Sequence, residues 1–232
     1  EGGEAAKWLM SHLEMRDFFL YTAFASGMNL YQKEGLPIGK KKKENPIVWT
    51  DPGTNERGLV LWKRWASSNT QFPLVDAAMT ELVQTGYCSN RVRQNMASFL
   101  TKDLNVDWRM GAEWFQFLLE DHCVGANWGN WLYFSGVGPD PKNRHFRTIS
   151  QSLRYDGDGT YVRKWLPILQ EYFDKDYEEK QNDAMEAMFR PWDYGVSGFD
   201  DPVVNPKEQL TWKDLQRLED TGSLKEDASL TL

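Results

Sequence analysis

Apolar residues recur at three- and four-residue spacing through most of this chain, and this spacing constrains its fold more than any other feature. The pattern predicts amphipathic helices, each with one buried face. Breaks of a few polar residues or glycines separate the segments and predict short connections. Strand signals are scarce, so the sequence predicts an all-α fold. The helices are expected at residues 5–26, 55–68, 73–86, 90–104, 107–123, 159–169 and 206–220.

One stretch interrupts this pattern. Residues 123–138, "CVGANWGNWLYFSGVG", place tryptophans and asparagines among four glycines. Each interior glycine costs a helix roughly 1 kcal/mol relative to alanine. Either the surrounding structure or a bound molecule must therefore hold this stretch. The turn signals "GVGPDPKNR" and "YDGDG" then predict a loop from Gly136 to Asp158.

Length, charge and cysteine content limit the function classes. The 232 residues suffice for one large domain or two small ones. The net charge of −7 argues against a nucleic-acid partner, and we expect the basic run Lys40–Lys43 to be a solvated loop. Neither an apolar run of about 18 residues nor a signal-peptide pattern is visible, so we expect an intracellular protein, soluble or peripheral, with no transmembrane segment of its own. Two cysteines without CxxC spacing, Cys88 and Cys123, favour a reducing compartment.

Short catalytic motifs are absent. The sequence has no P-loop, Rossmann fingerprint, zinc motif or G-x-S-x-G. His12, His122 and His145 lie in different segments, and we expect them to be structural. No catalytic residue and no metal ligand is therefore assigned. The 11 tryptophans leave two interpretations open, core packing or contact with a planar cofactor.

The order of several motifs adds a family resemblance. The segments "WTDPG", "FPLVDAAMTELVQTGYCSNRVRQNMASFLTKDLNVDWRMGAEWF", "NWGNWLYFSGVGPDPKNRHF" and "YDGDGTYVRKWLPIL" together resemble the photolyase/cryptochrome family, and its DASH-type members most. The resemblance implies the later part of the helical FAD-binding domain, without the N-terminal α/β domain. It implies a partial photolyase-like helical domain at residues 1–173. Residues 174–232 would be a charged insert and C-terminal extension that packs on or docks from it.

The resemblance also implies roles for individual residues. If FAD is bound, Asn127 falls where a residue faces flavin N5, and Arg93 and Asp121 fall where a salt-bridged pair lies beside the isoalloxazine. Asn90 and Arg16 match positions in the pocket wall. The proximal, middle and surface positions of the family's electron-transfer chain fall on Trp131, Trp108 and Trp49.

Departures from the family pattern weaken some of these implications. The chain passes from "GGE" almost directly to "RDFF", without the segment that clamps the FAD diphosphate, and we hypothesise a deletion there. Met15 and His12 stand where DNA-repairing members carry Trp and Glu. Cys123 replaces the second carboxylate of an Asp pair beside the flavin. Light-driven DNA repair is therefore not expected.

Two functions stay open. The first is a non-catalytic module that serves as a structural or interaction subunit of a larger assembly, in a light-related setting such as a photosynthetic or plastid complex. The alternative is a blue-light flavoprotein photoreceptor that uses FAD and the tryptophan chain. Bound flavin distinguishes the two.

Overall fold

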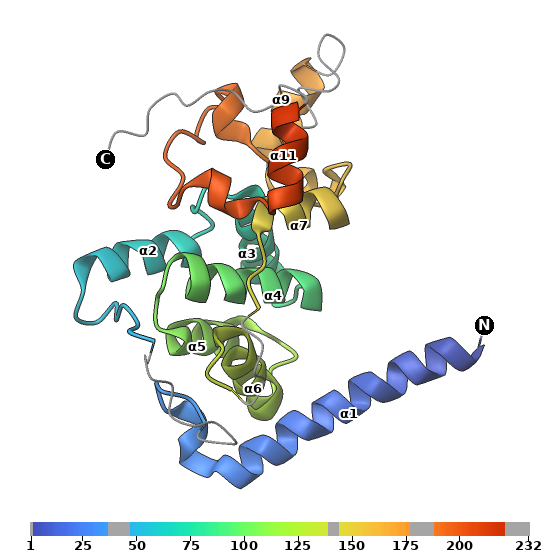
Figure 1. The fold of residues 1–232 in the computed structure, drawn as a ribbon, viewed down its shortest axis with the longest axis vertical. Helices are drawn as coiled ribbons and strands as arrows, with labels where there is room; N and C mark the ends of the chain where they lie inside the picture. Colours follow the sequence, from blue (N-terminus) through green and yellow to red (C-terminus); the bar gives the residue numbers. More distant parts are fainter. Residues whose placement is uncertain (1, 37–46, 139–143, 177–187, 221–232) are drawn as a thin grey trace. The chain divides into compact units, whose positions relative to one another are not determined.

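The computed structural model describes residues 2–36, 47–138, 144–176 and 188–220, and helices make up its regular structure (Figure 1). The lysine run 40–43 and most of the charged insert lie outside these residues. The described part contains no strand, only an isolated bridge between Thr50 and Val106, so the all-α prediction is confirmed. The helices are α1 (Gly2–Ser26), α2 (Glu56–Ala66), α3 (Pro73–Thr85), α4 (Asn90–Ser98), α5 (Trp108–Leu118), α6 (Val124–Ser135), α7 (Thr148–Tyr155), α8 (Thr160–Trp165), α9 (Pro167–Asp176) and α11 (Trp212–Asp220).

The chain forms two compact units, and each is built from two stretches of sequence. Residues 1–63 and 82–145 make the first unit, and residues 64–81 and 146–232 make the second. None of the described helices is long and apolar enough to cross a membrane.

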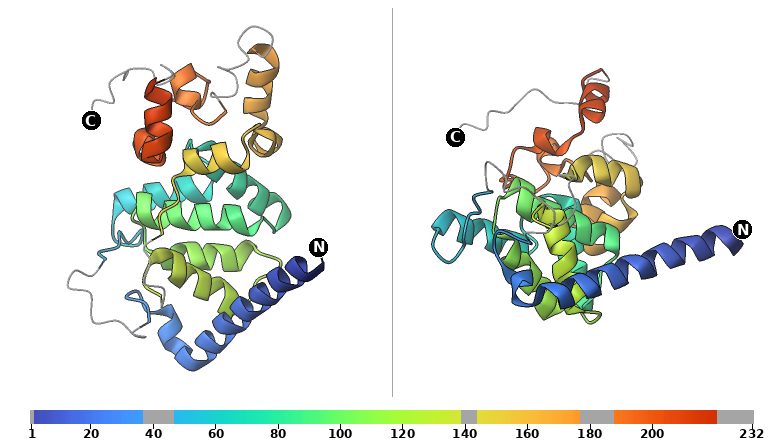
Figure 2. Two further views of the ribbon diagram at one scale, coloured as in Figure 1. Left: turned by 45° about the vertical axis from the view of Figure 1, so that its right-hand side comes forward. Right: turned by 60° about the horizontal axis from the view of Figure 1, so that its bottom comes forward.

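The glycine-rich stretch 123–138 folds mostly as α6, because its glycines let α1 come close. A Cβ atom on Gly129 would lie 2.4 Å from Cδ1 of Phe19, and one on Gly125 would lie 3.1 Å from the Cα atom of Leu20. Figures 1 and 2 show the C-terminal half of α1 crossing α6 while its N-terminal half runs on past it. Packing between the two helices thus offsets the poor helix propensity of glycine. The helix ends at Gly136, whose φ of +78° suits a glycine.

The predicted loop from Gly136 to Asp158 is wrong over residues 148–155, which form α7. This helix is polar, and its side chains form hydrogen bonds with the C-terminal segment of the same unit. Ser150 Oγ donates to Asp214 Oδ2 at 2.5 Å, and the amide of Thr148 donates to Oε1 of Gln209 at 3.2 Å. Because these partners lie some 60 residues away, local spacing gives no sign of the helix.

A buried carboxylate organises the start of α3 in the second unit. Oδ1 of Asp76 accepts hydrogen bonds from the amide and hydroxyl of Thr70, at 2.9 and 2.6 Å, and Oδ2 accepts one from the amide of Gln71 at 2.8 Å. These bonds satisfy donors ahead of the helix, where the backbone needs acceptors.

Candidate functional site

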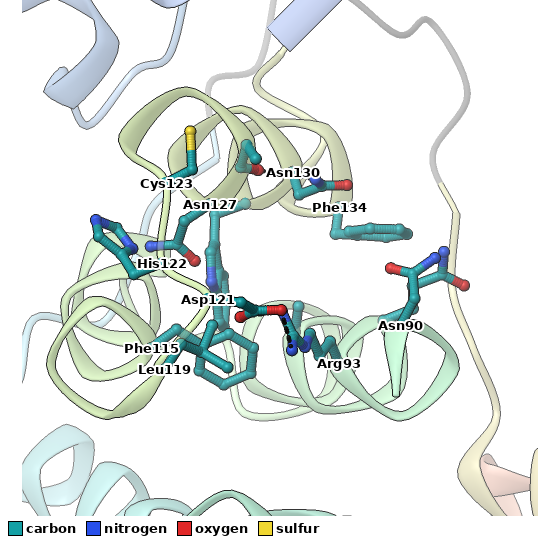
Figure 3. A pocket seen from close by; sticks show the side chains of 14 residues that line it. Asn90, Arg93, Phe115, Leu119, Asp121, His122, Cys123, Asn127, Asn130 and Phe134 are labelled. Atoms are coloured by element: carbon teal, nitrogen blue, oxygen red, sulfur yellow. Dashed lines mark hydrogen bonds and ion pairs between the residues drawn. The ribbon is translucent and has the colours of Figure 1, made fainter. Parts of the chain in front are cut away.

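A pocket in the first unit gathers most of the predicted cofactor residues (Figure 3). It lies among α4, α6, the end of α5 and the α5–α6 connection, and the cavity measures about 90 Å³. It is lined by Asn90, Arg93, Gln94, Ala97, Phe115, Leu119, Asp121, His122, Cys123, Ala126, Asn127, Asn130, Trp131 and Phe134. A cavity of this size holds part of a ring system rather than a whole dinucleotide.

Arg93 and Asp121 form a bidentate ion pair at the pocket (Figure 3). Nη1 of Arg93 donates to Oδ1 of Asp121 at 3.1 Å, and Nη2 donates to Oδ2 at 3.0 Å. Nε of Arg93 also donates to the carbonyl of Cys88 at 2.8 Å. Burial lowers the pKa of Arg93, but hydrogen bonding and charge interactions with Asp121 and Cys88 together outweigh it, so this pKa lies above its ordinary value. The guanidinium is thus fixed in position and permanently charged.

Asn127 contributes a positioned amide. Its side chain is buried, and Nδ2 donates to the carbonyl of Ala112 at 2.8 Å. That bond fixes the orientation of the amide, so Oδ1 borders the cavity as an acceptor.

Trp131 forms a flat apolar wall. It is 2% exposed, and its ring meets Phe115 edge to face at 5.1 Å between centroids. A Cβ atom on Gly111 would lie 2.2 Å from its Cη2 atom, so α5 leaves just enough room for the indole. The orientation of this ring is therefore set by packing on both sides.

His122 is a pocket residue that the sequence reasoning treated as structural. Both ring nitrogens are buried, and neither has a hydrogen-bond partner within the described residues. An unpaired buried polar group costs about 1–3 kcal/mol, so a ligand that bonds to it is favoured. Phe115, Asn130 and Phe134 also line the cavity and were not predicted. The position of His122, directly after Asp121, is the one sequence signal that could have identified it.

The remaining predicted residues lie elsewhere. Arg16 is on α1, outside the set of lining residues, with its side chain 56% exposed and paired to Oδ1 of Asp17 at 2.8 Å. Trp108 is fully buried, and its Nε1 donates to the carbonyl of Lys33 at 3.1 Å. Trp49 is also buried, at 5% exposed, although the resemblance implied a surface position.

The pocket combines flat aromatic walls with a charged pair, amides and an imidazole at its edges. This combination fits a planar heteroaromatic ring with a polar rim. The described residues contain no cluster of three or more His, Cys, Asp or Glu that could hold a metal ion.

Comparisons with known proteins agree with this geometry. Residues 8–213 match the family model "FAD binding domain of DNA photolyase". Cryptochrome DASH of Xenopus laevis is 45% identical over 169 residues, which are 72% of this chain and 30% of the relative. Cryptochrome DASH of Synechocystis sp. is 45% identical over 167 residues, 72% of this chain and 32% of the relative. The crystal structure of a Synechocystis cryptochrome superposes with a TM-score of 0.70 at 36% identity, covering 91% of this chain and 41% of the other.

The fold is that of the helical domain described by this family model, and the pocket lies within it. The chain belongs to the photolyase/cryptochrome family, and within it the chain resembles the DASH type. It spans about a third of the length of the relatives it matches.

Proposed function

We propose that this chain binds the isoalloxazine end of FAD in the pocket between α4 and α6. The observation that carries the proposal is the convergence of the Arg93–Asp121 pair, the amide of Asn127 and the ring of Trp131 on one cavity. The membership of the chain in a family of FAD-binding domains supports the same cofactor.

Each residue would have a distinct task. When bound, the flavin supplies one-electron chemistry and absorbs blue light. Trp131 covers the ring and excludes water from it, and Asn127 offers an acceptor to the polar part of the ring. Arg93, held by Asp121, places a fixed positive charge beside the ring and favours negative charge there.

The first experiment is a flavin assay of the natively purified protein. Acid-released flavin should approach one equivalent per chain, with the oxidised-flavin absorption spectrum in the native sample. A folded sample without flavin that also fails to take up added riboflavin or FAD would refute the proposal.

Two matched arginine variants test the site itself. Arg93→Gln should weaken flavin binding roughly tenfold or more, because a hydrogen bond to a charged group contributes about 1.5–3 kcal/mol. Arg16→Gln should bind as the wild type does, because this side chain lies outside the pocket. Titration monitored by flavin fluorescence measures both constants. If both substitutions weakened flavin binding equally, the flavin would contact α1, and the proposed site would be wrong.

A second function has its own supporting observation. The side chains of α1 include several large apolar groups that are well exposed, among them Trp8 at 64%, Tyr21 at 74% and Phe24 at 91%. Several large exposed apolar side chains on one helix support a role as a structural or interaction module of a larger assembly. A flavin-free protein that is folded only within such an assembly would favour this function. A photosynthetic or plastid setting for the assembly stays a prediction.

A further inference from the structure

The predicted electron-transfer tryptophans are all enclosed. Trp131 is 2% exposed, Trp108 0% and Trp49 5%. Electron transfer between aromatic rings weakens steeply with separation, so a donor in solution needs a ring nearer the surface than these. The aromatic contacts of the described residues offer such a path.

Two further aromatic rings continue from Trp108 in direct contact. The rings of Trp108 and Trp128 meet edge to face with centroids 5.6 Å apart. Trp128 then meets Tyr31 edge to face at 4.6 Å. The ring of Trp131 joins this set through the α5–α6 packing, since it rests on Gly111, one turn along α5 from Trp108, and lies one turn along α6 from Trp128.

Hydrogen bonds hold these rings in place. Nε1 of Trp108 donates to the carbonyl of Lys33, and Nε1 of Trp128 donates to Oε1 of Gln116 at 2.8 Å. Trp128 is itself buried, at 4% exposed. The distances between the rings are therefore set by the fold rather than by surface motion.

Tyr31 is where this path reaches solvent. It ends the short helix Gly27–Tyr31 after α1 and is only partly buried. Its hydroxyl makes no hydrogen bond within the described part of the chain, so water can accept its proton. Tyr31 and Trp128 line an open surface pocket together with Arg109, Glu113, Gln116 and Val124.

We propose that Tyr31 is a terminal electron donor of this protein, connected to Trp108 and Trp131 through Trp128. Its role in supplying a flavin rests on the proposed function. If a flavin occupies the pocket and absorbs light, Trp131 would give it one electron, and Trp108 would refill Trp131. Trp128 refills Trp108, and Tyr31 refills Trp128. Tyr31 then releases its phenolic proton to water and becomes a neutral tyrosyl radical. A one-electron reductant in solution, such as ascorbate, restores it through the surface pocket.

The path can be tested without a flavin by attaching a photo-oxidant at the edge of the cavity. Cys123 lines the cavity and is partly accessible, whereas Cys88 is fully buried, so a thiol-reactive ruthenium polypyridyl label should attach at Cys123. A laser flash with hexaammineruthenium(III) as the quencher leaves an oxidising equivalent on the label. Electron paramagnetic resonance and transient absorption then report tryptophan and tyrosyl radicals.

The labelled wild type should give a tyrosyl radical. Tyr31→Phe should lose it and leave a longer-lived tryptophan radical, and Trp128→Phe should lose it as well. Tyr21→Phe is the matched control, because this exposed tyrosine lies outside the path, and it should keep the full signal. Circular dichroism of each labelled protein verifies the fold.

Two results would overturn the proposal: a tyrosyl radical that persists in Tyr31→Phe, or a folded wild type in which no tyrosyl radical forms. Neither result depends on flavin affinity. If the flavin titration showed no binding, the cofactor proposal would be wrong. The radical experiment would still decide whether the electron-transfer path exists.

Discussion

Asp76 is a buried carboxylate, and its environment sets a pH dependence. Burial raises its pKa from the ordinary value of 3.8 to about 6, although three hydrogen bonds from Thr70 and Gln71 favour the charged form. The folded protein therefore holds a proton on Asp76 at pH values where the unfolded chain has lost it.

We expect this group to make the protein less stable as pH rises. Its stabilising effect is fully present below pH 3.8 and is lost as pH rises through about 6. A shift of about two pKa units corresponds to about 3 kcal/mol of unfolding free energy. The difference in unfolding free energy between wild type and Asp76→Asn should fall by up to that amount between about pH 4 and 7, measured by urea denaturation.

The control for this measurement is Asp200→Asn, since Asp200 is an exposed carboxylate of the same unit. Its difference from wild type should stay constant over the same pH range. A wild type and Asp76→Asn whose difference is equally flat would show that burial does not perturb Asp76.

Some residues of the site could be predicted from the sequence, and others could not. Asn90, Arg93, Asp121 and Asn127 line one pocket, and the family resemblance had implied that they lie together. Arg16 does not join them, because its position depends on how α1 packs, and the glycines of α6 determine that packing. The two unpaired nitrogens of His122 are a property of three-dimensional burial, which spacing along the chain does not carry.

At the scale of elements, α1 can contact α6 closely because α6 carries glycines, which have no side chain, at the contact. In Gly129→Ala the new methyl group would overlap the ring of Phe19, and overpacking of this kind costs about 1–3 kcal/mol. This loss should exceed the gain of roughly 1 kcal/mol that alanine brings to a helix. Thermal or urea unfolding of the variant measures the sum.

Gly3→Ala is the control that separates steric overlap from the change in helix propensity. Gly3 also lies in a helix, α1, but nothing stands within 4 Å of its Cβ position. This variant should be as stable as wild type or slightly more so. Destabilisation of equal size at both positions would argue against close packing as the cause.

Elements with strong apolar spacing could be predicted, and polar ones could not. The segment 73–86 was expected as a helix and forms α3, because its leucine, valine and alanine side chains are buried in a regular pattern. The helix α7 was missed because Thr148, Ser150 and Ser152 are buried through hydrogen bonds instead of apolar contact. Helix propensity is a weak prior that such tertiary contacts override.

At the scale of the whole molecule, the second unit is closed by contacts between its two sequence stretches. Arg64 pairs with Asp201 at 2.8 Å, and Phe72 packs on Trp192 at 5.1 Å between ring centroids. The hydroxyl of Tyr161 donates to Glu81 at 2.6 Å. Residues 64–81 thus depend on partners that come much later in the chain.

A fragment of residues 1–145 should therefore not fold as the intact protein does. It keeps the pocket residues but leaves Arg64, Phe72 and Glu81 without these partners. We expect strong binding of the dye ANS and a broad unfolding transition by circular dichroism, because apolar surface at the start of α3 is uncovered. A fragment with one sharp transition and no dye binding would show that the second unit is dispensable.

The split construction of the second unit also bears on how the protein is made. A ribosome releases residues 64–81 long before it has synthesised Trp192 and Asp201. At a typical rate of about 5–20 residues per second, the interval is on the order of ten seconds. During that time the apolar side chains of this stretch are available to chaperones, so the cell's folding machinery has a defined interval in which to act on the nascent chain.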